Sequence, residues 1–215
     1  MPTSNLQLLS VRVNRDRSIW GQFKYLSSFI TLRCGPSLTE HDTTVSLSDA
    51  AVNHLIHLLH LRTLRTHGPP PDYSATSLPL VFPPLERLTL GQGAARGWLS
   101  LLERLEDGAP IAQAATPLSK AKESLKVLNI KDNLSIYIDA SLISPIQSFR
   151  NLVDLDVQVC CHYGNDMGRC IFELSNDNVA ELAMALTQLG SLLLGRSCFK
   201  NTCPTTVACL LQYRK

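Results

Sequence analysis

The chain has 215 residues, 45% of them hydrophobic, which is enough apolar material for one continuous core. Its formal net charge of only +2 argues against a nucleic-acid binder, which usually carries a dense basic stripe. The first residues lack the basic start and apolar run of a signal peptide, and no stretch of about 18 apolar residues occurs, so we expect a cytoplasmic or nuclear protein.

The dominant pattern is a Leu-x-x-Leu-x-Leu spacing, with Val or Ile at some last positions, followed in most copies by Asn, Cys or Gly three residues later. The copies begin at Leu6, Leu85, Leu125, Leu152 and Leu189. This spacing is the signature of leucine-rich repeats, in which one short strand per repeat stacks on its neighbours. We therefore predict an α/β fold, an irregular leucine-rich repeat solenoid. It would be a horseshoe with a parallel sheet on the concave side and helices and loops on the convex side.

Between the first two copies, the sequence predicts two further strands and one helix. SSFITLRC is expected to be a strand with Ile30 and Leu32 facing inward, because alternation then exposes the residues between and after them. SLSDAAVNHLIHLL predicts an amphipathic helix over Ser48–Leu59, with Ser46 and Asp49 as its capping box. The LRTLRTH segment that follows is expected to be the next strand.

The middle of the chain alternates loops and one helix. Prolines in GPPPDYSATSLPLVFPP forbid a regular helix, so residues 68–84 are expected to form an irregular loop. Arg96–Asp107 has leucines at helical spacing and predicts a helix. A second irregular loop is expected over residues 107–120.

Helices are also expected beside the last repeats. Ser144 and Pro145 suit the start of a short helix that ends near Phe149. Asn176–Leu189 predicts a longer helix, with Ser175 or its own first residue as cap. We expect residues 1–215 to be one repeat domain. Because neither end has a clear polar capping unit, we also expect it to be a piece of a longer repeat array or a truncated gene product.

The second half of the chain carries a family resemblance. The phrases FRNLVDLDVQVC, IFELSNDNVAELAMALTQLGSLLLG and CFKNTCPTTVACLL resemble the leucine-rich region of fungal F-box-like proteins. In that family an F-box docks onto the adaptor of a cullin-type ubiquitin ligase, while the repeats capture a substrate protein. The resemblance covers roughly the second half closely and the first half only in the phrases SLSDAAVNHLIHLL and PPLERLTL, and no F-box is visible in this chain. It implies substrate recognition by the repeats, and it implies the ligase adaptor as a partner only if an F-box belongs to the whole gene product.

Strand geometry predicts which side chains could bind a partner. The residues next to the inward leucines alternate to the concave side, where we expect a protein partner to bind. The candidate residues are Arg12, Arg33, Arg65, His67, Arg87, Asn129, Lys131, Asp154, Asp156 and Gln158. This face would be basic toward the N-terminus and acidic near Leu152, and such a gradient would orient a partner of opposite polarity.

Catalytic, cofactor and metal sites are weakly indicated. The GQGAARG turn over Gly91–Gly97 resembles a dinucleotide-binding turn, and a nucleotide-dependent α/β enzyme is our alternative hypothesis, although Arg96 occupies the third glycine position. The histidines at 54, 57 and 60 fit the polar face of a helix. The seven cysteines contain no Cys-x-x-Cys pair and are expected to be reduced thiols. We predict no catalytic residues, cofactor or metal.

Overall fold

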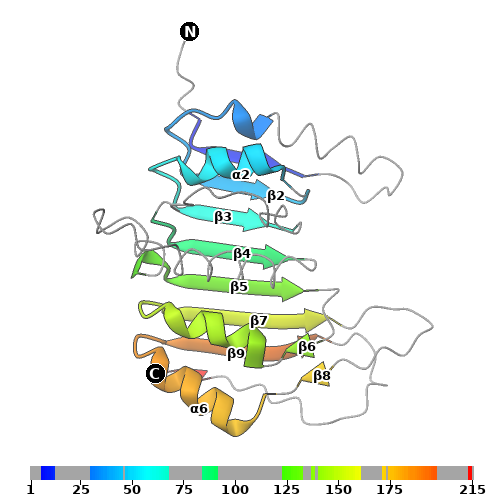
Figure 1. The fold of residues 1–215 in the computed structure, drawn as a ribbon, viewed down its shortest axis with the longest axis vertical. Helices are drawn as coiled ribbons and strands as arrows, with labels where there is room; N and C mark the ends of the chain where they lie inside the picture. Colours follow the sequence, from blue (N-terminus) through cyan, green and yellow to red (C-terminus); the bar gives the residue numbers. More distant parts are fainter. Residues whose placement is uncertain are drawn as a thin grey trace, which may run out of the picture.

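The computed structural model describes residues 6–12, 30–45, 47–67, 84–91, 123–132, 137–138, 140–160, 171–172, 174–197 and 213–214. One sheet in this part of the chain contains eight strands. They are β1 Leu8–Val11, β2 Glu40–Thr43, β3 Thr63–Thr66, β4 Arg87–Gly91, β5 Val127–Asp132, β7 Asp154–Cys160, β9 Ser191–Ser197 and β10 Tyr213–Arg214. The first seven are parallel and lie side by side in chain order, whereas β10 pairs antiparallel with β9 (Figure 1). The α/β class with a parallel sheet is therefore confirmed.

The leucine spacing determines the register of the sheet. The second leucines of the repeats form one row across the strands, Leu64, Leu88, Leu128, Leu155 and Leu192. The last apolar positions form a second row, Leu90, Ile130, Val157 and Leu194. Because side chains on a strand alternate between faces, both rows point to the same side, and all of them are buried. A shift of one residue would expose them all, so the hydrophobic pattern fixes the register.

The helix α2, Asp49–Ile56, confirms the helix expected over Ser48–Leu59, but it ends earlier and its cap differs from the prediction. The hydroxyl of Ser48 accepts a hydrogen bond from the backbone N–H of Ala51, so Ser48 is the N-cap. Asp49 is then the first helical residue, and the predicted capping box of Ser46 and Asp49 is wrong. Both serines precede an apolar stripe, and the spacing alone does not distinguish them.

The other helices follow their predicted signals. The helix α5, Ala140–Ile143, continues into the 3-10 helix η3, Ser144–Ser148, which carries a proline in its first turn. The helix α6, Asn176–Ala185, is capped by Ser175, whose hydroxyl and backbone N–H form a capping box with Asn178. The expected cap at Ser175 is therefore confirmed. The expected short helix is present, but its helical segment already begins at Ala140, and α6 ends earlier than predicted.

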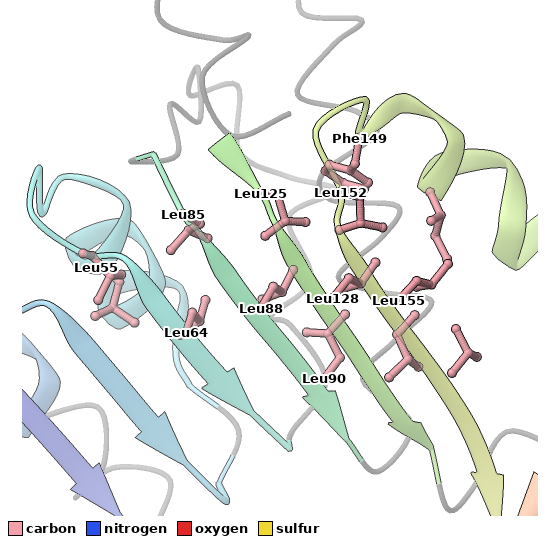
Figure 2. Close-up of a cluster of buried hydrophobic side chains, with 14 of the residues drawn as sticks. Leu55, Leu64, Leu85, Leu88, Leu90, Leu125, Leu128, Phe149, Leu152 and Leu155 are labelled. Carbon is pink, nitrogen blue, oxygen red and sulfur yellow. The ribbon is translucent and has the colours of Figure 1, made fainter. Parts of the chain in front are cut away.

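One hydrophobic core joins the helices to the sheet. Leu55 of α2, Phe149 after η3 and Leu182 of α6 are buried in the same cluster as the inward leucine rows. Figure 2 shows Leu55 and Phe149 beside the leucines of β3 to β7. The helices therefore cover one face of the sheet, with residues 140–148 in front of β7 and β9 (Figure 1). Truncating an inward leucine such as Leu88 to alanine would cost about 2–5 kcal/mol.

The second strand is not where the sequence predicts it. Residues 30–32 are helical, and the backbone N–H of Arg33 bonds to the carbonyl of Ile30, so the expected strand at Ile30 and Leu32 is wrong. The strand is β2, whose inward residues are His41 and Thr43. Polar residues at leucine positions hide this repeat from a search for apolar spacing.

A second, two-stranded sheet pairs β6, Tyr137–Ile138, with β8, Ile171–Phe172. Each of these strands has two residues, which is too short for an alternating pattern to predict. The predicted helix over Arg96–Asp107 and the loop over residues 107–120 lie outside the described residues. Of the loop expected over 68–84, only Pro84 is described, and it has no regular structure.

Candidate functional site

The face of the sheet opposite the core is the face on which we expected the candidate residues, and we call it the outer face. It is formed by the alternate residues of each strand. One row across the strands contains Leu8, Glu40, Thr63, Arg87, Val127, Asp154 and Ser191. The next row contains Ser10, Asp42, Arg65, Thr89, Asn129, Asp156 and Leu193. Apart from Asp42 and Thr63, these side chains are half-buried or exposed. The outer face is therefore polar and partly open to solvent.

At the N-terminal end, the outer face carries an ion pair. The Arg12 guanidinium donates two hydrogen bonds to Oδ2 of Asp42, from Nη2 at 2.8 Å and from Nε at 3.3 Å. The Asp42 side chain is 6% exposed and that of Arg12 70%, so the arginine covers a nearly buried carboxylate. The pair neutralises both charges. The predicted basic character of this end therefore does not extend to Arg12.

Two arginines form the basic part of the outer face. Arg65 on β3 lies opposite Thr89 of β4, and Arg87 on β4 lies opposite Thr63 of β3. The two arginines are thus diagonal neighbours on the same face, a separation that long side chains span. Arg87 is exposed and Arg65 is half-buried. Neither forms an ion pair with another of the described residues.

Two aspartates form the acidic part, both on β7. Asp154 and Asp156 are half-buried and point to the same side because they are two residues apart on one strand. Gln158 Nε2 donates a hydrogen bond to Oδ2 of Asp156 at 3.0 Å. Oδ1 of Asp156 is buried and has no hydrogen-bond partner within the described part of the chain.

Burial raises the pKa of the Asp156 carboxyl group, and the charge of Asp154 adds to that effect. The hydrogen bond from Gln158 and the charge of Lys131 act in the opposite direction without cancelling it. A positive charge placed beside Asp156 would favour its ionised form. This end of the outer face therefore suits a cationic group.

The structure brings most of the predicted residues to the outer face. Asn129 lies in the row of Asp156, and Lys131 follows it at the exposed end of β5. Arg33 is the exception, because it lies in the turn after the helical residues 30–32 and is not part of the sheet. The prediction that Arg33 lies on this face is wrong, and it fails with the strand on which it depended.

His67 has a local structural role. It follows β3, and a Cβ atom added to Gly91 at the end of β4 would overlap Nδ1 of its ring. Gly91 therefore allows the imidazole to pack against the strand backbone. Only Gly91 of the Gly91–Gly97 turn is described, so the nucleotide-binding alternative stays a prediction. The close packing of the His67 ring explains a glycine at position 91 without a bound phosphate.

Sequence reasoning missed Asp42, which supports Arg12, and His41, which replaces an inward leucine beside it. The segment Leu38-x-x-His41-x-Thr43 has the repeat spacing with polar residues at the last two positions. A search for the repeat spacing that also allowed polar residues at these positions would have found this segment. The Thr43 hydroxyl is satisfied locally, since it donates to the carbonyl of Val45 and accepts from its N–H.

The comparisons do not add a family to this geometry. No family model matches the chain, and neither the curated proteins nor the solved structures provide a match. Within the described residues, no group of three or more His, Cys, Asp or Glu is arranged to hold a metal ion. None of the helices described here is long and apolar enough to cross a membrane. A functional assignment therefore depends on the outer face itself.

Proposed function

We propose that this chain is a non-catalytic protein-binding module in which a leucine-rich repeat solenoid presents its outer sheet face to a protein partner. The repeat assignment is supported by a buried leucine that precedes each of six strands at the same spacing. These residues are Leu38, Leu61, Leu85, Leu125, Leu152 and Leu189. Each layer buries its leucines against the next, which is how repeat arrays form a continuous core.

The observation that carries the binding proposal is the composition of the outer face. A sheet face that only needed to be soluble could be uniformly polar and neutralised by ion pairs. Here Arg65 and Arg87 lack ion pairs among the described residues, and Asp156 has a buried carboxylate oxygen without a partner. Unpartnered charges on a rigid scaffold favour recognition of a complementary surface.

We extend the proposal to substrate recognition within an F-box-like ubiquitin-ligase receptor. This extension is supported by the resemblance of the quoted sequence phrases alone. The repeats would hold the substrate, and the ligase adaptor would bind an F-box that is not visible in this chain. The outer face proposal does not depend on this extension.

Co-purification with point variants tests the binding proposal. The tagged protein is expressed in its native cells, and its co-purifying proteins are compared for wild type, Asn129→Arg and Met184→Arg. Asn129 lies in the middle of the outer face, whereas Met184 is 71% exposed on α6 and is the matched control. We expect Asn129→Arg to remove a protein that wild type and Met184→Arg both retain. If every co-purifying protein survives Asn129→Arg, the outer face is not the binding surface.

A further inference from the structure

From β3 to β7, the charges in the two rows of the outer face change sign across the strands. Arg65 and Arg87 lie on β3 and β4, and Asp154 and Asp156 lie on β7. The strand between β4 and β7 is β5, which contributes the half-buried and uncharged Val127 and Asn129 to the same two rows. From β3 to β7, these two rows therefore pass through a basic, an uncharged and an acidic zone. Beside the basic zone, β2 contributes Glu40 and the Asp42 that pairs with Arg12, and Lys131 lies two residues further along β5.

The register gives the distances between these zones. Arg87, Val127 and Asp154 are aligned in one row, so two strand spacings separate the arginine from the aspartate, about 10 Å. Arg65 and Asp156 lie in the next row, three strand spacings apart, about 14 Å. An extended peptide rises about 3.3 Å per residue, so these distances correspond to about three to four residues.

In both charged zones, some charged groups lack an interaction partner within the described part of the chain. The two arginine side chains have no acidic partner there, so their guanidinium groups are available to a carboxylate. Asp156 uses Oδ2 for Gln158, and its Oδ1 has no partner. A buried carboxylate oxygen without a hydrogen bond is costly, and a cationic side chain placed over the accessible part of Asp156 would offset part of that cost.

A ligand of a single charge sign fits this surface poorly. A polyanion such as a nucleic acid would gain from Arg65 and Arg87 but would be repelled where it crossed Asp154 and Asp156. A uniformly basic segment meets the opposite problem at the arginines. Charge complementarity therefore favours a protein segment that carries both signs, separated by a few residues.

Building on the proposed function, we propose that the outer face binds an extended protein segment that crosses the strands. Its acidic side chain lies over Arg65 and Arg87, and a Lys or Arg about three to four residues away lies over Asp154 and Asp156. The uncharged part of the segment rests on Val127 and Asn129.

A selection of random peptides tests this proposal directly. Short peptides displayed on phage are selected against the full chain, and bound peptides are sequenced. For wild type we expect enrichment of an acidic residue about three to four positions from a basic one. Synthetic versions should lose at least about tenfold in affinity for Arg65→Glu/Arg87→Glu and for Asp154→Lys/Asp156→Lys.

The reversed variants also predict which new peptides are selected. The Arg65→Glu/Arg87→Glu protein carries acidic residues in both charged zones and should select basic peptides, whereas Asp154→Lys/Asp156→Lys should select acidic ones. Glu123→Lys/Glu181→Lys changes two exposed acids outside the outer face and is the control that should select the same peptides as wild type. Thermal unfolding of each variant verifies that it is folded.

The outcomes separate this inference from the proposed function. Peptides that are lost with Asn129→Arg but show no charge spacing, or that bind both reversed variants as wild type does, would overturn the inference and leave the binding face intact. The absence of any enriched peptide would overturn the inference alone, whereas enriched peptides indifferent to Asn129→Arg would contradict both the inference and the proposed function.

Discussion

The imidazole of His41 lies beside the hydroxyl of Thr31, with Nε2 and Oγ1 3.0 Å apart, and both residues are fully buried. This hydrogen bond joins the helical residues 30–32 to β2. His41 occupies the row of inward leucines, between Leu9 of β1 and Leu64 of β3. Its Nδ1 has no hydrogen-bond partner among the described residues. A polar side chain thus replaces the apolar contact made at this position by the later repeats.

This buried histidine predicts that stability decreases in mild acid. Burial lowers the pKa of His41 from 6.5 to about 4, although the charge of Asp42 acts in the opposite direction. Between these values the unfolded chain binds the proton and the folded chain does not, so stability falls as pH falls. We expect the free energy of unfolding to drop by about 2 kcal/mol from about pH 7 to about pH 5, measured by urea denaturation.

His41→Leu is the control for the acid effect. The leucine restores the apolar row, and Thr31 keeps another interaction, so we expect near-neutral stability at pH 7. The loss of stability between the two pH values should shrink by most of its size. An unchanged pH dependence in His41→Leu would assign the acid sensitivity to other groups.

A second prediction compares two ion pairs of different burial. Arg12→Ala leaves the Asp42 carboxylate, 6% exposed, without its cation and should cost about 1–3 kcal/mol in denaturation experiments. Lys126 and Glu86 are 58% and 46% exposed and 3.6 Å apart, so Lys126→Ala should cost less than about 1 kcal/mol. Equal costs for the two variants would show that Arg12 does not stabilise Asp42.

A third prediction concerns the packing of His67 on β4. Gly91→Ala places a methyl group in the position of the imidazole ring and should destabilise the protein by about 1 kcal/mol or more. Gly190→Ala is the matched control, because its Cβ would meet only Val153 atoms at 3.7 and 3.8 Å. Adding His67→Ala to Gly91→Ala should recover part of the loss. A Gly91→Ala variant as stable as Gly190→Ala would contradict this packing.

A fourth prediction separates stability from binding at Asp156. Asp156→Asn removes a half-buried charge with a partnerless oxygen, so thermal unfolding at neutral pH should occur at a higher temperature. Because burial raises the pKa of this carboxyl group, its charged form destabilises the fold above that pKa, and the gain should disappear in acid. The same variant should bind the selected peptides more weakly. A loss of stability at neutral pH would contradict this account of Asp156.

The leucine spacing predicts most strands because each repeat buries its apolar side chains at the same interval. It finds β4, β5 and β7, where Leu88, Leu128 and Leu155 are inward. It fails at β2, since His41 and Thr43 are buried by tertiary contacts and a hydrogen bond that no local pattern encodes. Intrinsic alternation instead favoured a strand at Ile30, where the chain is helical.

The candidate site was also predictable where it depends on the apolar pattern and not where it depends on tertiary contacts. Residues that alternate with the leucines, such as Arg87 and Asp156, reach the outer face because register is a direct consequence of the apolar pattern. The Arg12 ion pair could not be predicted, because its partner Asp42 lies on the strand that the pattern missed. The half-buried state of Asp156 depends on neighbouring strands, so it is also a property of the folded sheet.

Photo-crosslinking in native cells tests the central claim, that the outer face binds a protein, most directly. A photoreactive amino acid is placed at Asn129 on the outer face or at Met184 on α6, and the crosslinked proteins are identified after irradiation. We predict a discrete crosslinked protein from position 129 that is absent from position 184. Identical crosslinks from both positions, or crosslinks from position 184 alone, would contradict the assignment of the outer face as the binding surface.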